Sequence, residues 1–208
     1  MKFLRIAVIA CDIFQKELDL LIGNDPNIVH KEYLEFALHD HPDDLKARIV
    51  EKVNALVGKA DAVFLGYAVC QSLKGIVNEL PIPTVMLDAD DCIGVFLTPA
   101  EYANEKEKCP GTWFNSPRWA ELGLEGANRE LHLDCLKDQG YEPIYFLRMM
   151  FEGYERCLFL DTGVPERDKW ESLSKEFADQ LELRHECRSC DLRMLENGLD
   201  MARTKARN

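Results

Sequence analysis

Three cysteines stand just after short apolar runs that have the composition of buried β-strands. Cys11 closes "RIAVIAC", Cys70 follows "AVFLGYAV", and Cys92 follows "TVMLDADD". The binding crevice of an open parallel sheet lies outside the carboxyl ends of its strands. Thiolates are the ligands that zinc, copper(I) and iron–sulfur clusters prefer, and three protein ligands leave one coordination position for a substrate. The three positions therefore predict a metal centre that is open to chemistry.

A histidine in "FALHDHP" extends this row. His39 ends another apolar run, so it would give a fourth, borderline ligand at the same edge. Simpler roles also fit, because cysteine fills strand ends as a small apolar side chain and a histidine beside Asp40 suits a solvent-facing or helix-capping position. The neighbours expected to shape a substrate pocket are Tyr67, Asp91, Trp113 and Arg118.

A second group of soft ligands occurs in "HECRSC", which contains His185, Cys187 and Cys190. A structural zinc site needs a second C-x-x-C pair, and this segment neither follows a first strand nor opens a thioredoxin-like helix. The pattern predicts either a second metal site or two incidental cysteines near the last helix. The glycine-rich dinucleotide loop, the Walker loop, H-E-x-x-H and G-x-S-x-G do not occur in the sequence, so nucleotide-binding, zincin and serine-hydrolase functions lack their usual support.

The elements that would position these side chains alternate between apolar runs and longer amphipathic segments, as in repeated β-α units. We expect an α/β three-layer sandwich with a mostly parallel, doubly wound sheet that begins in the flavodoxin-like strand order 2-1-3-4. In this order Cys11 and Cys70 lie on neighbouring strands roughly 5 Å apart, with Cys92 one strand further on. Expected strands are 3–10, 31–38, 62–66, 83–87 and 156–161, expected helices are 14–22, 43–57, 73–79, 99–107, 117–136, 166–181 and 191–205, and "NEKEKCPGTWFNSPRW" is expected to be a loop.

Length and composition bound the remaining properties. A chain of 208 residues can build one substantial core, so we expect a single α/β domain with a C-terminal helical extension from about residue 186. The net charge of −12 argues against binding nucleic acid or an anionic membrane surface. The apolar runs fall far short of the ~20 residues that span a bilayer, and the run after "MKFLR" is too short for a signal peptide. These features predict a cytoplasmic protein whose eight cysteines stay reduced.

Several segments, taken together, resemble a known family. They are "IAC", "LHDHP", "LGYAVCQSLKGI", "DADDCIGVFL" and "PGTWFNSPRW", and the family is domain of unknown function 1638, which the chain resembles over about residues 3 to 200. The family pattern carries cysteines that match Cys11, Cys70 and Cys92 and a histidine that matches His39. Members occur alongside methylamine methyltransferases and corrinoid proteins in methanogenic archaea and anaerobic bacteria. The resemblance therefore implies a role in anaerobic one-carbon metabolism.

These observations lead to one expected function and two alternatives. The first is a metal-binding protein of one-carbon or corrinoid-linked metabolism that holds a [4Fe–4S] cluster or zinc. If this protein is an enzyme, it would be a metal-dependent methyltransferase or lyase that acts on a small-molecule substrate. The second is a non-catalytic accessory protein that carries a metal or cofactor to a methyltransferase or corrinoid protein. The third is a metal-free enzyme with Cys70 as nucleophile and His39 as base. A homo-oligomer is compatible with each of them.

Overall fold

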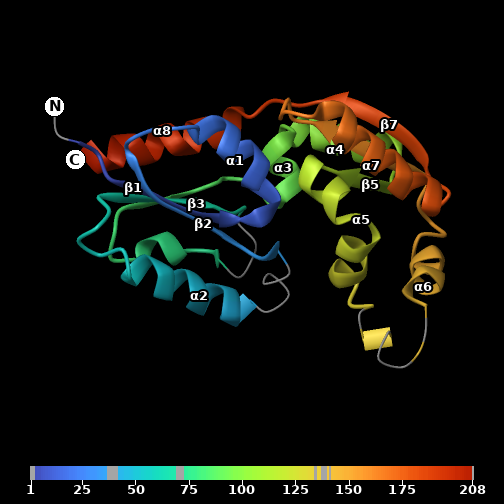
Figure 1. Ribbon diagram of the computed structural model, residues 1–208, viewed down its shortest axis with the longest axis horizontal. Coiled ribbons are helices and arrows are strands. Elements are labelled where there is room, and N and C mark those ends of the chain that lie inside the picture. The colour runs from blue at the N-terminus through green and yellow to red at the C-terminus, as the bar shows by residue number, and fades with distance from the viewer. Residues whose placement is uncertain are drawn as a thin grey trace. The chain divides into compact units, whose positions relative to one another are not determined.

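The computed structural model of the protein describes residues 3–36, 42–68, 73–133, 135–136, 140 and 142–207 (Figure 1). Contacts within the chain divide it into two compact units, which we call the first unit (Met1–Phe96 and Leu192–Asn208) and the second unit (Leu97–Asp191). The sequence led us to expect one domain with a helical extension. In the structure the last helix is part of the first unit, and a strand occupies the segment where the extension was expected to begin.

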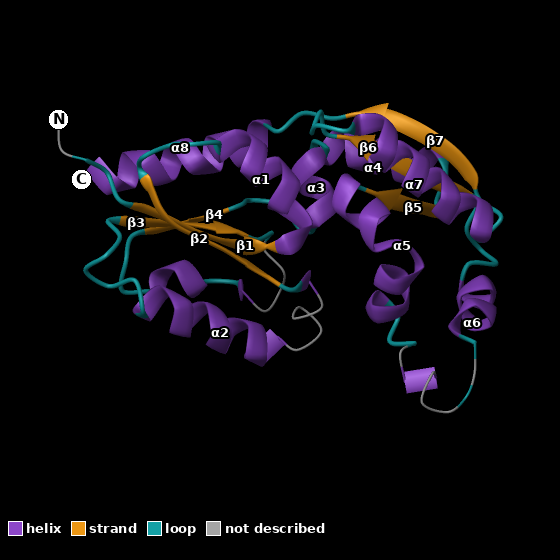
Figure 2. Ribbon diagram, viewed as in Figure 1, coloured by secondary structure: helices purple, strands orange, loops and turns teal. Residues whose placement is uncertain are grey.

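The first unit is built on a parallel sheet whose strand order is β2-β1-β3-β4 (Figure 2). Its strands are β1 (Ile6–Cys11), β2 (Ile28–Leu34), β3 (Ala62–Gly66) and β4 (Thr84–Met86). This order confirms the expected flavodoxin-like start. All of β3 and nearly all of β1 are buried, because a central parallel strand is covered on both faces, and this is why both strands read as continuous apolar runs.

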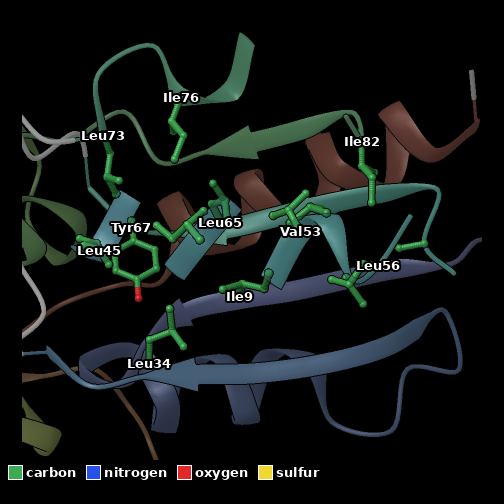
Figure 3. Packing of buried hydrophobic residues seen from close by; sticks show 14 residues of the cluster. Ile9, Leu34, Leu45, Val53, Leu56, Leu65, Tyr67, Leu73, Ile76 and Ile82 are labelled. Atoms are coloured by element: carbon green, nitrogen blue, oxygen red, sulfur yellow. The ribbon is translucent and has the colours of Figure 1, made fainter. Parts of the chain in front are cut away.

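Helices cover both faces of this sheet, which gives the expected three-layer sandwich (Figure 2). The 3₁₀ turn η1 (Asp12–Phe14), α1 (Gln15–Ile22) and α8 (Arg193–Arg207) lie on one face, and α2 (Pro42–Asn54) lies on the other. On the α2 face, Figure 3 shows Ile9 and Leu65 of the sheet within a buried cluster that includes Val53. The apolar positions of α2 recur at helical spacing, so this face could be predicted from the sequence.

On the opposite face, α8 approaches the sheet closely at one glycine. A Cβ placed on Gly198 would lie 2.5 Å from Cε2 of Phe64 and 3.3 Å from Cδ2 of Leu87. Phe64 is fully buried and cannot easily move away. Glycine at this position therefore allows α8 to pack directly against β3 and β4.

The second unit is a second parallel sheet, ordered β5-β6-β7, with helices on both faces. Its strands are β5 (Thr112–Asn115), β6 (Arg156–Asp161) and β7 (Arg184–Ser189). Helix α4 (Pro99–Lys108) lies on the face of Arg156, whereas α5 (Pro117–Glu130), α6 (Pro143–Met150) and α7 (Arg167–Gln180) pack on the face of Cys157.

The structure corrects several expected elements. The segment expected to be a loop around Trp113 contains β5, and β7 was not expected at all. The helix expected over residues 73–79 is only the 3₁₀ turn η4 (Ile76–Asn78), the short helix α6 was missed, and the helix start expected at Cys92 is the short helix α3 (Cys92–Phe96). The strand expected over residues 31–38 begins earlier, at Ile28, and its expected end falls outside the described residues. Short elements carry too few turns for a period to be recognised.

Candidate functional site

The carboxyl edge of the first sheet carries two of the predicted ligands. Cys11 is the last residue of β1, and Cys92 is the first residue of α3, which five residues separate from the end of β4; both are partly buried. Ala10 pairs with Gly66, so β1 and β3 end side by side and the chain leaves β3 at the same edge. Cys70 and His39 lie outside the described residues. The strand order thus places Cys11 and Cys92 at the edge that the sequence predicted.

Two of the expected pocket neighbours are also found at this edge. Asp91 caps α3, since its Oδ1 accepts a hydrogen bond of 2.7 Å from the Gly94 amide. Tyr67 follows β3 and is buried in the cluster drawn in Figure 3. Across the described ranges, the His, Cys, Asp and Glu side chains form no group of three or more that could hold a metal ion. The thiols of Cys11 and Cys92 are donors suited to a soft metal.

The other two expected pocket residues lie in the second unit, where each has a structural role. The ring of Trp113 lies 5.2 Å from that of Phe151, 5.7 Å from that of Trp119 and 5.8 Å from that of Phe177, measured between centroids. Arg118 forms an ion pair with Glu121 at 2.6 Å on the surface of α5. Trp113 is therefore the centre of an aromatic cluster.

The C-x-x-C segment is extended, and this changes what its cysteines can do. Cys187 lies on β7, and the amide of Cys190 continues the ladder by donating to the carbonyl of Asp161 at 2.8 Å. Residues three apart along a strand are roughly 10 Å apart and point to opposite faces. Burial raises the pKa of Cys190 to about 12. The structure therefore does not bring His185, Cys187 and Cys190 together as three ligands.

Sequence reasoning missed a buried polar cluster beneath α7. Its centre is the hydroxyl of Ser174, which lies 3.2 Å from Asn115 Nδ2, 3.2 Å from His185 Nε2 and 3.6 Å from Cys157 Sγ. Asn115 and Ser174 are fully buried, and burial raises the pKa of Cys157 to about 11. The thiol therefore stays protonated at neutral pH, which makes it a packing and hydrogen-bonding group rather than a nucleophile. The four residues come from three strands and a helix, so no local sequence pattern predicts that they form a cluster.

An ion cluster lies on the other face of the same sheet. Arg156 Nη1 lies 2.9 Å from Glu105 and 3.0 Å from Glu186, and Arg188 Nη1 lies 2.6 Å from Glu105. Burial alone would raise the pKa of Glu105, but hydrogen bonds from Lys108, Arg188 and Arg156 outweigh it, so this pKa lies below its usual value. Arg156 and Glu105 are almost completely buried. The charges bind one another, which makes this cluster a structural element.

His185 should make the stability of the second unit depend on pH. Burial lowers the pKa of His185, with Lys175 adding to this effect and Glu171 and Asp179 opposing it. The unfolded chain then binds the proton more readily than the folded one, so the free energy of unfolding should fall as the pH drops below about 6.5. All three tryptophans, Trp113, Trp119 and Trp170, belong to the second unit, so their fluorescence during urea unfolding reports on it.

The variant His185→Gln should flatten this slope. The matched control is His30→Gln, which lies in the first unit and should leave the slope of the tryptophan signal unchanged. An unaltered slope in His185→Gln would show that other groups cause the pH dependence.

In the part of the chain that the structure describes, no helix has both the length and the apolar character needed to cross a membrane.

Comparisons with known proteins place the chain in a family. Searches among curated proteins and among solved structures return no significant match. A family model does match residues 33–199, a range that contains the positions of His39, Cys70 and Cys92. The match covers most of the 208 residues and confirms the resemblance seen in the sequence: the chain belongs to the family described as "Protein of unknown function (DUF1638)".

Proposed function

We propose that the protein binds a metal centre, a [4Fe–4S] cluster or zinc, at the carboxyl edge of its first sheet through Cys11, Cys70 and Cys92. The observation that carries this proposal is the strand order β2-β1-β3-β4 with Cys11 at the end of β1 and Cys92 at the start of α3, the first helix after β4. Both thiols are partly exposed, as ligands to an accessible centre must be. Cys70 follows the strand that lies between them.

Strand spacing favours the cluster over a single zinc ion. One strand separates β1 from β4, so the carboxyl ends of these two strands are roughly 10 Å apart, and Cys92 follows the end of β4 after five further residues. A cluster with several iron atoms bridges such a gap more easily than one zinc ion, whose four ligands converge on a single point. His39, water or an external ligand would take the fourth position. The metal would supply Lewis-acid or redox chemistry, while the protein residues hold and orient the bound molecule.

The setting we propose is anaerobic one-carbon metabolism linked to methylamine and corrinoid proteins, in the cytoplasm. It rests on the family resemblance and on thiols that need a reducing compartment. As an enzyme the protein would act as a metal-dependent methyltransferase or lyase on a small molecule; without turnover it would carry a metal or cofactor to a methyltransferase. The net charge of −12 disfavours nucleic acid and anionic membranes as partners.

Metal content after anaerobic purification tests this proposal. Cys11→Ser, Cys70→Ser and Cys92→Ser should each lose most of the metal, because three thiolates at one site act together. Cys135→Ser is the matched control, since Cys135 is exposed and lies in the second unit, and it should keep the full amount. Bound iron with a brown colour identifies the cluster, and stoichiometric colourless zinc identifies a zinc site.

Equal metal content in all four variants would contradict a shared site. A wild type that holds no metal after anaerobic purification would instead favour the thiol enzyme with Cys70 as nucleophile.

A further inference from the structure

Strand β7 has a free edge. It pairs with β6 on one side, and among the described residues no strand pairs with its other side. The amides of Arg184 and Cys190 donate to carbonyl oxygens at either end of β6, at 3.0 and 2.8 Å. The peptide groups of a strand face its two neighbours alternately, so the N–H and C=O groups of His185, Cys187 and Ser189 point to the free edge. This edge is a template for another strand.

The edge is accessible and charged. Cys187 and Ser189 are exposed. Glu186 and Arg188 keep 38% and 25% of their side-chain area exposed, although both take part in the ion cluster with Glu105 and so lie on one face of the sheet. Charged side chains on an edge repel most strands, so a partner strand has to match these charges.

The charges favour one antiparallel pairing of β7 with a second copy of itself. A two-fold axis at Cys187 places Glu186 of each copy directly opposite Arg188 of the other, so opposite charges meet twice. Moving the axis by one residue, to Glu186 or to Arg188, would place that charged residue opposite its own copy, which is destabilising. The charge pattern of β7 is therefore self-complementary about Cys187.

The same pairing uses the backbone groups at the edge. The Cys187 residues of the two copies exchange both of their N–H···O hydrogen bonds, and His185 bonds in the same way to Ser189 of the other copy. An axis between two residues would set an outward-facing peptide group against one that faces β6. An axis at His185 or at Ser189 would pair only a short part of the strand. The axis at Cys187 thus satisfies charge, hydrogen bonding and length together.

We propose that the protein forms a symmetric dimer in which the free edges of β7 pair antiparallel about Cys187 and join two three-stranded sheets into one. The interface lies in the second unit, so it does not depend on the metal centre. In this pairing the two Cys187 Cα atoms are about 5.5 Å apart, a distance that a disulfide can span.

Sedimentation equilibrium of the reduced full-length protein, at physiological ionic strength, should give twice the mass of one chain. Cys187→Pro removes a donor at the centre of the interface, where the amide does not face β6, so the strand should tolerate it. The dissociation constant of the dimer should then rise about tenfold or more. Cys187→Ser keeps the amide and should remain a dimer. A monomeric wild type, or a dimer that Cys187→Pro leaves unchanged, would overturn the proposal.

Oxidation with diamide tests the register. It should link Cys187 of one copy to Cys187 of the other, which mass spectrometry of the linked peptide identifies. The double variant Cys187→Ser, Ser189→Cys places its two thiols roughly 13 Å apart along the strands, too far for a disulfide, so it should stay unlinked. Linking at position 189 instead of 187 would contradict the proposed pairing. If Cys187→Pro does not fold, these two cross-linking results decide the matter alone.

Discussion

Replacing Arg156 with methionine should destabilise the second unit by about 3–5 kcal/mol. Arg156 is almost completely buried, and its guanidinium binds Glu105, Glu186 and Thr112 at 2.9–3.0 Å. Its removal leaves the buried carboxylate of Glu105 with fewer partners, and burying an incompletely paired charge is the expensive part of breaking such a pair. Urea unfolding followed by tryptophan fluorescence measures the loss, because all tryptophans lie in this unit.

Two further variants separate burial from charge. Arg184→Met breaks a more exposed pair with Glu186 and should cost about 1 kcal/mol or less. In the double variant Arg156→Met, Glu105→Gln the buried carboxylate that lost Arg156 as a partner is gone as well, so part of the stability should return. A loss in Arg156→Met as small as in Arg184→Met would show that the cluster contributes little to stability.

Replacing Trp113 with alanine should cost about 3 kcal/mol, at the lower end of the range for large aromatic residues because the ring is only partly buried. The substitution removes the ring that contacts Trp119, Phe151 and Phe177 and leaves a cavity between β5 and the helices that cover it. Circular dichroism during urea unfolding is the suitable measurement, since the substitution itself changes the fluorescence.

Two comparisons test the assignment of Trp113 to the core. Trp113→Phe keeps an aromatic ring and should restore much of the loss. Tyr145→Ala removes a ring that is 64% exposed, so its effect should be small. Wild-type stability in Trp113→Ala would mean that the ring belongs to a binding pocket instead, as the sequence first led us to expect.

The sequence predicted the parts of the fold that are periodic and buried. Residues 62–66 and 156–161 were expected as strands with the bounds that the structure has, because strands covered on both faces read as apolar runs. Strand β7 was missed, since "RHECRS" is an edge strand whose residues are exposed or only partly buried. Glu186 and Arg188 of this strand form ion pairs with residues far away in the sequence, Arg156 and Glu105, and no local pattern shows these pairs.

The candidate site could be predicted as far as strand topology determines it. Strand ends of a parallel sheet gather at one edge, so Cys11 and Cys92 were expected where the structure has them. The C-x-x-C spacing was misleading, because its ligand geometry requires a turn and the segment is extended. The cluster around Ser174 depends on which helix face meets which strand, and this is decided by tertiary packing rather than by the period of any one segment.

Helix α8 has a consequence for the order in which the protein matures on the ribosome. The first unit needs α8 to cover the sheet face that carries Phe64, yet α8 is synthesised only after the whole second unit. The second unit, Leu97–Asp191, is continuous and is complete before then. Domains usually mature from the amino terminus onward. Here the nascent chain should finish its second unit while the first unit still exposes an apolar sheet face. The first unit should therefore remain open to aggregation or chaperone binding until α8 has left the exit tunnel.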